Sequence, residues 1–156
     1  MDIRRSQPCD INGITTVYEL CFPNEESHGS WVEASMNSYP RGIYYVIESN
    51  DDVVGYVLWC VKNGFRSSTI IELEQVAIAP DFHGKGYGRA LIEKSFGLFK
   101  GHVLELGYKV GAVMVTTSEG NYAEDLYISA LGVARSAVLQ GYGSGNEIIL
   151  YNNSIC

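Results

Sequence analysis

A glycine-rich segment between residues 83 and 89 has the composition of an anion-binding loop. Its sequence is His83-Gly84-Lys85-Gly86-Tyr87-Gly88-Arg89, with a strand-like run before it and a helix-like run after it. Glycines at alternate positions permit backbone angles with φ > 0 and let amide N–H groups approach a ligand closely. The start of a helix adds unpaired N–H donors and a partial positive charge. The segment therefore predicts a diphosphate site, although a tight glycine turn that simply starts a helix has the same pattern.

Two other phosphate-binding motifs do not fit this segment. A dinucleotide-binding fingerprint requires glycine where Arg89 stands, and a nucleoside-triphosphate loop requires Gly-Lys-Ser or Gly-Lys-Thr where residues 84–86 are Gly-Lys-Gly. A second glycine cluster at residues 141–146 precedes a strand-like run and has no helix behind it. We interpret this second cluster as a hairpin turn.

The pattern of apolar residues predicts the elements that must position the loop. Helical spacing predicts amphipathic helices over 10–22, after Gly88 and over 122–131, and a short helix near 31–36 within the polar loop 24–40. Strands are predicted over 43–48, 53–61, 69–79, 109–117, 134–140 and 147–151. A strand-helix-strand unit around Phe96 requires a right-handed parallel crossover, so the order of elements predicts a mixed sheet.

The length and composition are those of a single globular domain over residues 1–156. A formal net charge of −7 argues against nucleic-acid binding, because that function requires a basic surface. The four cysteines, Cys9, Cys21, Cys60 and Cys156, form no C-x-x-C pair, so neither a metal site nor a disulfide framework is expected. The chain has no secretory start and no long apolar run, so we expect a cytoplasmic protein without a membrane partner.

Three motifs resemble the GCN5-related N-acetyltransferase (GNAT) superfamily. Residues 83–88 match its Gln/Arg-x-x-Gly-x-Gly/Ala signature, with His83 in place of Gln or Arg. The run ELEQVAIAP over residues 72–80 looks like the superfamily's fourth strand, including the proline that ends it. Residues 123–133 are similar to its Asn-x-x-Ala-x-x-Leu-Tyr-x-x-Leu-Gly-Phe motif, with Asn121 one place after the usual asparagine. The order of elements agrees from end to end.

The resemblance implies an α/β (α+β) fold in which helices flank a mixed, mostly antiparallel central sheet with a splayed parallel strand pair. It also implies acetyl-coenzyme A as the co-substrate, with no metal. The residues that the resemblance assigns to coenzyme binding are Val76, Ala77, Ile78, His83, Gly84, Lys85, Gly86, Tyr87, Gly88, Arg89 and Asn121. Backbone N–H groups of residues 76–78 are expected to bind the pantetheine amides and the developing oxyanion.

The implied reaction needs a base, because an amine attacks a thioester as the free base and alkyl amines are almost wholly protonated at neutral pH. In an ideal strand Glu72 and Glu74 share one face with apolar neighbours, which would raise a carboxylate pKa toward the working range. Glu74 lies at the spacing of the acid in polyamine acetyltransferases of the superfamily, and Glu72 at that of the histone-type base. We favour Glu74; the alternative is that one or both carboxylates are exposed and paired with cations.

Tyr127 stands where the superfamily's general acid is often found, so it is expected to protonate the departing thiolate, with core packing as the alternative. The expected function is direct transfer of acetyl from acetyl-coenzyme A to a primary amine, either a small cationic amine or a protein N-terminus or lysine. The alternative is a non-catalytic acyl-coenzyme A binding or sensing module of the same fold. A monomer or a homodimer is expected.

Overall fold

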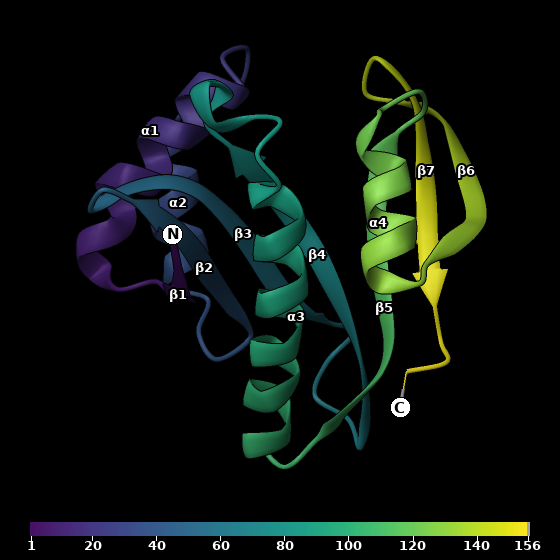
Figure 1. Ribbon diagram of the computed structural model, residues 1–156. Coiled ribbons are helices and arrows are strands. Elements are labelled where there is room, and N and C mark those ends of the chain that lie inside the picture. The colour runs from purple at the N-terminus through teal and green to yellow at the C-terminus, as the bar shows by residue number, and fades with distance from the viewer. Residues whose placement is uncertain (156) are drawn as a thin grey trace. The chain divides into compact units, whose positions relative to one another are not determined.

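The structure is a computed structural model that describes residues 1–155 (Figure 1). Its elements in chain order, with η denoting a 3₁₀ helix, are β1 (Asp2–Arg5), η1 (Pro8–Asp10), α1 (Ile11–Cys21), α2 (His28–Met36), β2 (Gly42–Ser49), β3 (Asp52–Lys62), β4 (Ser68–Ile78), η2 (Pro80–Phe82), α3 (Tyr87–Glu105), β5 (Lys109–Ser118), α4 (Ala123–Leu131), β6 (Ala134–Tyr142) and β7 (Gly145–Asn152). Each helix and strand predicted from the sequence is confirmed.

The chain divides into two compact units. One consists of Met1–Cys60 and Gln75–Phe99, and the other consists of Val61–Glu74 and the chain from Lys100 onward. β4 and α3 therefore each contribute residues to both units. The single domain expected from the sequence stays a prediction.

In the first unit, helices cover both faces of the antiparallel strands β2 and β3. Residues 42–47 of β2 are all buried, as expected for a strand that is covered on both faces. Tyr44 and alternate residues of β2 and β3 form a hydrophobic cluster with α1 and α2. On the opposite face, Trp59 packs against Phe99 of α3 with ring centroids 6.2 Å apart, and its Nε1–H donates to Ser95 Oγ at 2.8 Å. Figure 1 shows α3 on one side of these strands and α1 and α2 on the other.

The end of β4 is held against β3 at a glycine. A Cβ atom at Gly55 would lie 2.5 Å from Ile78 Cδ1 and 3.0 Å from the Ala77 carbonyl oxygen, so the strand end approaches Gly55 closely. Next to it, the Ala79 N–H donates to the Val54 carbonyl at 2.8 Å. The glycine-rich loop is thus anchored at the strand that precedes it as well as at the helix that follows it.

The second unit contains the first part of β4 together with β5, β7, β6 and α4. β4 pairs with β5 in parallel, from Ser68 opposite Lys109 to Leu73 opposite Val115. β5 and β7 pair antiparallel, as do β6 and β7, and the strand order is β1-β2-β3-β4-β5-β7-β6. The predicted fold is therefore confirmed as a mixed, mostly antiparallel sheet with one parallel pair and flanking helices. The splaying of that pair stays a prediction.

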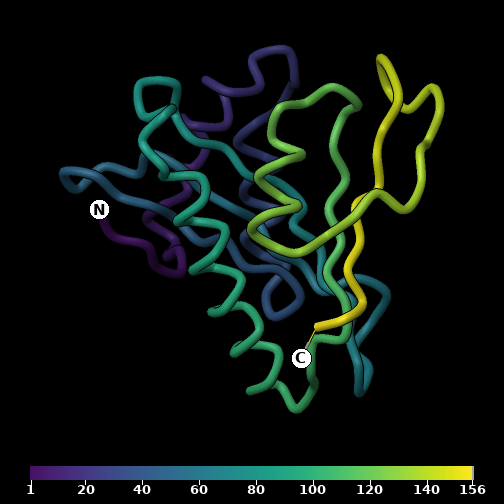
Figure 2. Tube along the Cα trace, turned by 45° about the vertical axis from the view of Figure 1, so that its right-hand side comes forward, coloured from purple at the N-terminus to yellow at the C-terminus, as the bar shows by residue number. Residues whose placement is uncertain are grey.

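β6 and β7 form the predicted hairpin at the C-terminal end of the chain (Figure 2). Tyr142 pairs with Gly145 at its tip. Gly141 and Gly143 have φ values of +68° and +62°, which glycine adopts without a steric penalty. The interpretation of the second glycine cluster as a turn is confirmed.

β1 is a strand that the sequence pattern did not predict. It pairs antiparallel with β2, from Asp2 opposite Glu48 to Arg5 opposite Tyr45. Ile3 is the one buried residue among its four, so the alternation that marks a strand consists of a single apolar side chain.

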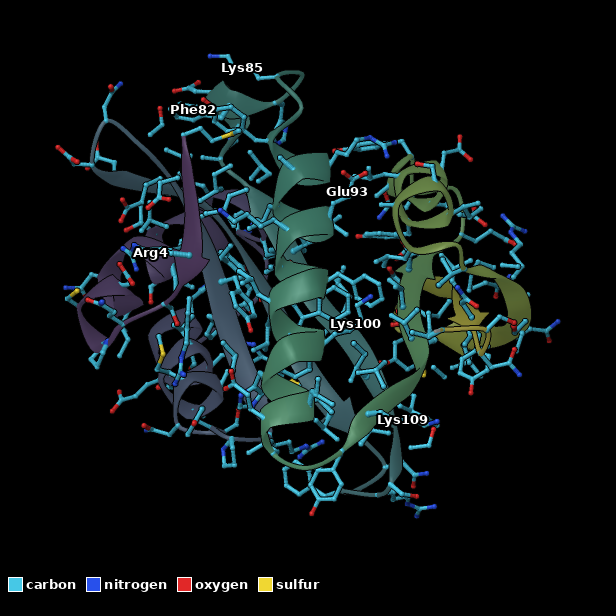
Figure 3. The ribbon with its side chains drawn as sticks, turned by 60° about the horizontal axis from the view of Figure 1, so that its bottom comes forward. Arg4, Phe82, Lys85, Glu93, Lys100 and Lys109 are labelled. Atoms are coloured by element: carbon cyan, nitrogen blue, oxygen red, sulfur yellow. The ribbon has the colours of Figure 1, made fainter. Side chains whose placement is uncertain are left out.

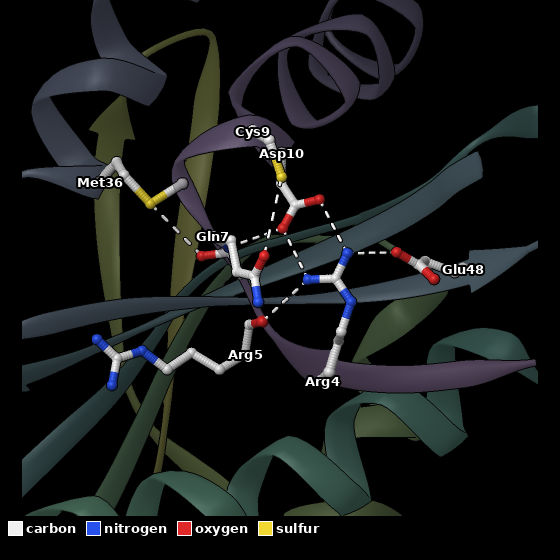
Figure 4. A network of polar contacts seen from close by, with 8 residues as sticks. Arg4, Arg5, Gln7, Cys9, Asp10, Met36 and Glu48 are labelled. Atoms are coloured by element: carbon white, nitrogen blue, oxygen red, sulfur yellow. Dashed lines mark hydrogen bonds and ion pairs between the residues drawn. The ribbon is translucent and has the colours of Figure 1, made fainter. Parts of the chain in front are cut away.

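A partly buried ionic network joins β1 to the residues before α1 (Figure 4). The Arg4 guanidinium donates to both carboxylate oxygens of Asp10 at 2.8 and 2.9 Å, and also to Glu48 of β2. Asp10 is 5% exposed and accepts a further bond from the Gln7 N–H at 2.7 Å. The hydrogen bonds from Arg4 hold the pKa of the Asp10 carboxyl below its usual value.

Asp10→Asn is expected to lower the free energy of unfolding at pH 7 by about 2 kcal/mol, because it weakens charge-assisted hydrogen bonds at a buried site. The folded-state pKa of Asp10 lies below its unfolded value, so its contribution is present above about pH 4 and is lost as the pH falls through the folded-state value. Urea unfolding at pH 7 and at pH 3 should show the difference from the unsubstituted protein shrinking at the lower pH. Asp2→Asn, an exposed change on β1, the strand that carries Arg4, should have little effect, and equal losses from both variants would contradict this account.

Candidate active site

Within the segment 83–89, residues 83–86 form an exposed loop and residues 87–89 begin α3. Residues 83–86 are exposed, and Gly84 and Gly86 have φ values of +75° and +79°. A Cβ atom added at either glycine would meet nothing within 4 Å, so this backbone is open to a ligand. The Gly86 carbonyl accepts the Ala90 N–H at 3.1 Å, which places Gly86 just before the first turn of α3. The leading N–H groups of a helix have no intrahelical partner, so the geometry suits an anion.

Aromatic packing fixes the shape of this loop. The Phe82 and Tyr87 rings stack with centroids 5.8 Å apart. Lys85 Nζ lies 5.1 Å from the Phe82 ring centroid, and Figure 3 shows the two side chains beside each other. Lys85 is exposed, so its charge is accessible to a phosphate that approaches the loop glycines.

Arg89, in the first turn of α3, pairs with a carboxylate of its own helix. Its Nη1–H donates to Glu93 Oε1 at 3.1 Å, and both side chains are about half exposed. A surface pair at this spacing is worth about 0.3–0.5 kcal/mol, less than a phosphate gains from several charge-assisted bonds. The Glu93 carboxylate is therefore a weak competitor for an anionic ligand at Arg89.

His83 contacts the backbone of β4. Its Nε2 lies 2.6 Å from the carbonyl oxygen of Ile78, and the thiol of Cys21 at the end of α1 donates to the same oxygen at 3.3 Å. Burial raises the pKa of the Cys21 thiol, which favours the protonated, donating form. A carbonyl oxygen has two lone pairs, so two donors engage it fully. His83 ties the loop to the end of β4, a positioning contact that the sequence did not predict.

His83→Ala is expected to weaken coenzyme A binding about three- to tenfold, because one hydrogen bond that holds the loop is lost. His83→Gln should retain most of the affinity, since the glutamine amide can also donate to the Ile78 carbonyl. Isothermal titration calorimetry of the three proteins would measure the effect. An equal loss in both variants would show that the bond to Ile78 does not matter for binding.

The residues predicted to bind the pantetheine arm form the end of β4. Ala77 is buried in the cluster that contains Tyr56, whereas Val76 and Ile78 are half-buried. Strand alternation therefore places Val76 and Ile78 on the face opposite Ala77. Coenzyme binding by their backbone N–H groups stays a prediction.

In the second unit, β4 carries both predicted carboxylates on its less buried face. Residues 69, 71 and 73 are buried, whereas Glu72 is half-buried and Glu74 is exposed. Glu72 Oε1 lies 3.5 Å from Lys62 Nζ, and the Glu72 side chain is 13% exposed. The alternative that the sequence left open, an exposed carboxylate paired with a cation, is met only in part, because Glu72 has a cationic partner but is half-buried, whereas Glu74 is the exposed one.

Tyr127 of α4 is a buried tyrosine with a perturbed pKa. It is 7% exposed, and its burial, with a smaller contribution from Tyr122, raises its pKa to about 12. The phenol therefore keeps its proton throughout the neutral range. The Tyr127 hydroxyl is therefore a hydrogen-bond donor at neutral pH. Its role as the acid for the departing thiolate stays a prediction.

Asn121 caps α4. Its Oδ1 accepts the Ala123 N–H at 2.9 Å, and its own N–H donates to the Ser118 carbonyl at 3.0 Å. These bonds satisfy backbone groups at the helix start, which is a common role for asparagine. A role of Asn121 in coenzyme binding stays a prediction.

Metal-binding chemistry has no obvious centre in the part of the chain that the structure describes. Within residues 1–155, no group of three or more His, Cys, Asp and Glu side chains could hold a metal ion. Cys9, Cys21 and Cys60 form no disulfide with one another, and Cys156 lies outside the described residues. None of the helices in the same range combines the length and the apolar character that a membrane crossing requires.

A polar network in the first unit was missed by the sequence analysis. Tyr18 O–H donates to Glu25 Oε1, and Tyr56 O–H donates to Gln75 Oε1 at 3.0 Å. The Gln75 side chain also lies beside the Tyr18 hydroxyl. These residues come from α1, the loop after it, β3 and β4, so no local spacing connects them. The one available signal was a tyrosine at a core position of α1.

Comparisons with known proteins agree with this geometry. A sequence profile of the Acetyltransferase (GNAT) family matches residues 11–132. A curated relative, described as an uncharacterized N-acetyltransferase of Archaeoglobus fulgidus, is 24% identical over 157 residues, which cover 94% of this chain and 100% of the relative.

Two solved structures share the fold. An aminoglycoside 6'-N-acetyltransferase complexed with coenzyme A has a TM-score of 0.76 at 16% identity, over 100% of this chain and 98% of that one. The ribosomal-protein-S18-alanine N-acetyltransferase from Escherichia coli has a TM-score of 0.76 at 18% identity, over 99% of this chain and 95% of that one. Because the family profile spans every element from α1 to α4, this chain belongs to the acetyltransferase (GNAT) family.

Proposed function

We propose that this protein transfers the acetyl group of acetyl-coenzyme A directly to a primary amine. The observation that carries the proposal is the exposed loop at residues 83–86, whose two glycines with positive φ lead into α3. In a chain of the acetyltransferase (GNAT) family, this loop suits the diphosphate of coenzyme A. The aminoglycoside 6'-N-acetyltransferase of the same fold was solved with coenzyme A, which supports the assignment.

The loop binds the diphosphate through main-chain N–H groups at and after Gly84 and through the partial positive charge of the α3 N-terminus. Lys85 and Arg89 add two cationic side chains to a chain whose formal net charge is −7. Backbone N–H groups of residues 76–78 bind the pantetheine arm and the oxyanion that forms at the thioester carbonyl.

In the transfer step the free amine nitrogen attacks the thioester carbonyl carbon, the carbon–sulfur bond breaks, and coenzyme A leaves as the thiolate, which then takes a proton from water. The proton that the nitrogen loses passes to a carboxylate, directly or through water. Glu72 must leave its ion pair with Lys62 before it takes that proton, whereas Glu74 is exposed, so we assign the base to Glu74. Tyr127 donates a hydrogen bond to the departing sulfur.

The acceptor is either a small cationic amine or a protein N-terminus or lysine. The two solved relatives are named for acceptors of both kinds, an aminoglycoside and a ribosomal-protein alanine. The net negative charge favours an acceptor with positive charge. The cytoplasmic location and the monomeric or homodimeric state expected from the sequence stay predictions.

The experiment that tests this function is a mass-spectrometric screen of amines, peptides and small basic metabolites with acetyl-coenzyme A. We expect at least one acceptor to gain an acetyl group, and Glu74→Gln to slow that transfer more than Glu72→Gln. Tight binding of coenzyme A without transfer to any acceptor would instead support the non-catalytic acyl-coenzyme A module.

A further inference from the structure

The loop after α1 presents an exposed carboxylate, that of Glu25, which accepts a hydrogen bond from the buried Tyr18. Tyr18 is 2% exposed and Tyr56 is fully buried. The Tyr56 hydroxyl contacts Gln75, Gln75 lies beside the Tyr18 hydroxyl, and that hydroxyl contacts the exposed Glu25. The bonds run in one direction: Tyr56 donates to Gln75, and Tyr18 donates to Glu25. A surface glutamate is normally free to adopt many rotamers, so this support fixes one carboxylate in one place.

The loop itself is held in the same place by other contacts. The Glu25 N–H donates to the Phe22 carbonyl at 3.2 Å, and His28 Nε2 lies 2.8 Å from the same oxygen. The His28 ring also packs edge-on against Tyr18 with centroids 4.5 Å apart. Glu25 is thus built into the structure, unlike its neighbour Glu26.

The charge of Glu25 has no cationic partner among residues 1–155. Its Oε1 accepts from Tyr18, and no ion pair or hydrogen bond of Oε2 is described within that range. Such a carboxylate is held in one orientation by the bond to its Oε1. Its Oε2 can therefore accept a charge-assisted hydrogen bond from an ammonium group.

The position of this carboxylate agrees with an acceptor site. Gln75, which links the two tyrosines, directly precedes Val76, where the strand end is expected to bind the thioester arm. Ala77 belongs to the same buried cluster as Tyr18 and Tyr56. The network therefore lies on the α1 and α2 face of the strand end.

We infer that Glu25, positioned by Tyr18 and Gln75, binds the alkylammonium group of a cationic acceptor before that group loses its proton. The inference rests on the acetyltransferase function proposed above and assigns its acceptor to the class of cationic alkyl amines. A small diamine and the N-terminus of a peptide both present this group.

The test compares Glu25→Gln, which keeps the size of the side chain and its bond to Tyr18, with the matched control Glu26→Gln. Acceptors are 1,4-diaminobutane, a short peptide with a free N-terminus, and O-methylhydroxylamine, which is uncharged at neutral pH. For whichever cationic acceptor the protein acetylates, Glu25→Gln should lower kcat/KM by about ten- to a hundredfold, which is the effect of one charge-assisted hydrogen bond. Glu26→Gln should stay within about twofold.

Two readouts separate this role from a structural one. The KM for acetyl-coenzyme A and the rate with O-methylhydroxylamine should be almost unchanged in Glu25→Gln. Tyr18→Phe should reproduce part of the loss with the cationic acceptors, because Glu25 is then less well held. Equal losses with charged and uncharged acceptors, or equal effects of Glu25→Gln and Glu26→Gln, would overturn the inference.

A binding arm distinguishes this inference from the proposed function. Calorimetric titration of 1,4-diaminobutane and the peptide into the protein saturated with coenzyme A requires no transfer. Weaker binding of the probes in Glu25→Gln but not in Glu26→Gln would support the site, even if no acceptor were acetylated. Absence of acetylation would then contradict the proposed catalysis and not the binding site. If neither probe binds or is acetylated, or if both variants bind the probes like the unsubstituted protein, the site is wrong.

Discussion

Gly86→Glu is expected to reduce the affinity for coenzyme A at least about a hundredfold, or roughly 2.7 kcal/mol. Gly86 has a φ of +79°, and its surroundings are open, so the new side chain strains the backbone and projects into the space expected to hold the diphosphate. The glutamate charge also repels the phosphates at close range. Calorimetric titration with coenzyme A measures the change.

Gly141→Glu is a matched control for this substitution. Gly141 also has a positive φ, +68°, and no atom within 4 Å of an added Cβ, but it lies near the end of β6, next to the β6–β7 turn. The two variants thus share the strain and the added charge and differ in position. Similar coenzyme affinities for both would show that the loop before α3 is not the diphosphate site.

Tyr127→Phe is expected to lower kcat about a hundredfold while leaving the KM for acetyl-coenzyme A nearly unchanged, because the hydrogen bond to the sulfur forms as the thiolate leaves. Since burial raises the Tyr127 pKa to about 12, the hydroxyl should remain a donor from pH 7 to pH 10. Over that range the rate should rise with the fraction of free amine, and the variant should show the same pH profile at a lower level.

Tyr108→Phe provides the comparison for this loss. Tyr108 is half-buried and stacks on Phe65 with centroids 5.5 Å apart, so the change removes a hydroxyl from a packed tyrosine elsewhere in the same unit. Its kcat should stay within about twofold of the unsubstituted protein. If Tyr127→Phe retained full kcat, Tyr127 would be a packing residue, as the sequence also allowed.

The sequence predicted the fold well because most of its elements carry a strong periodic signal. α1 and α3 each bury one stripe, and β2 and β3 are apolar runs bounded by Asn50 and Asp51, both of which have positive φ in the turn. β1 escaped prediction because its four residues include one buried side chain, and pairing with β2 defines the strand. Such a strand exists through its partner and not through a local preference.

The candidate site was predictable where backbone geometry is local and unpredictable where partners are distant. The alternating glycines predicted an open loop at residues 83–86, and in the structure Gly84 and Gly86 have positive φ. The ion pair between Lys62 and Glu72 and the bond from His83 to Ile78 depend on how side chains meet after folding. The network from Tyr56 to Glu25 joins four separate segments of the chain, so the spacing of residues along the sequence could not predict it.

The central claim is that main-chain N–H groups at the start of α3 bind the diphosphate of coenzyme A. The most direct test is a titration of ¹⁵N-labelled protein with coenzyme A, followed through the amide resonances of Gly84, Gly86 and Gly88. We predict saturable shifts at these three amides, with little change at Gly141 and Gly143. Saturable binding that leaves all three loop amides unshifted and moves resonances elsewhere would contradict the account.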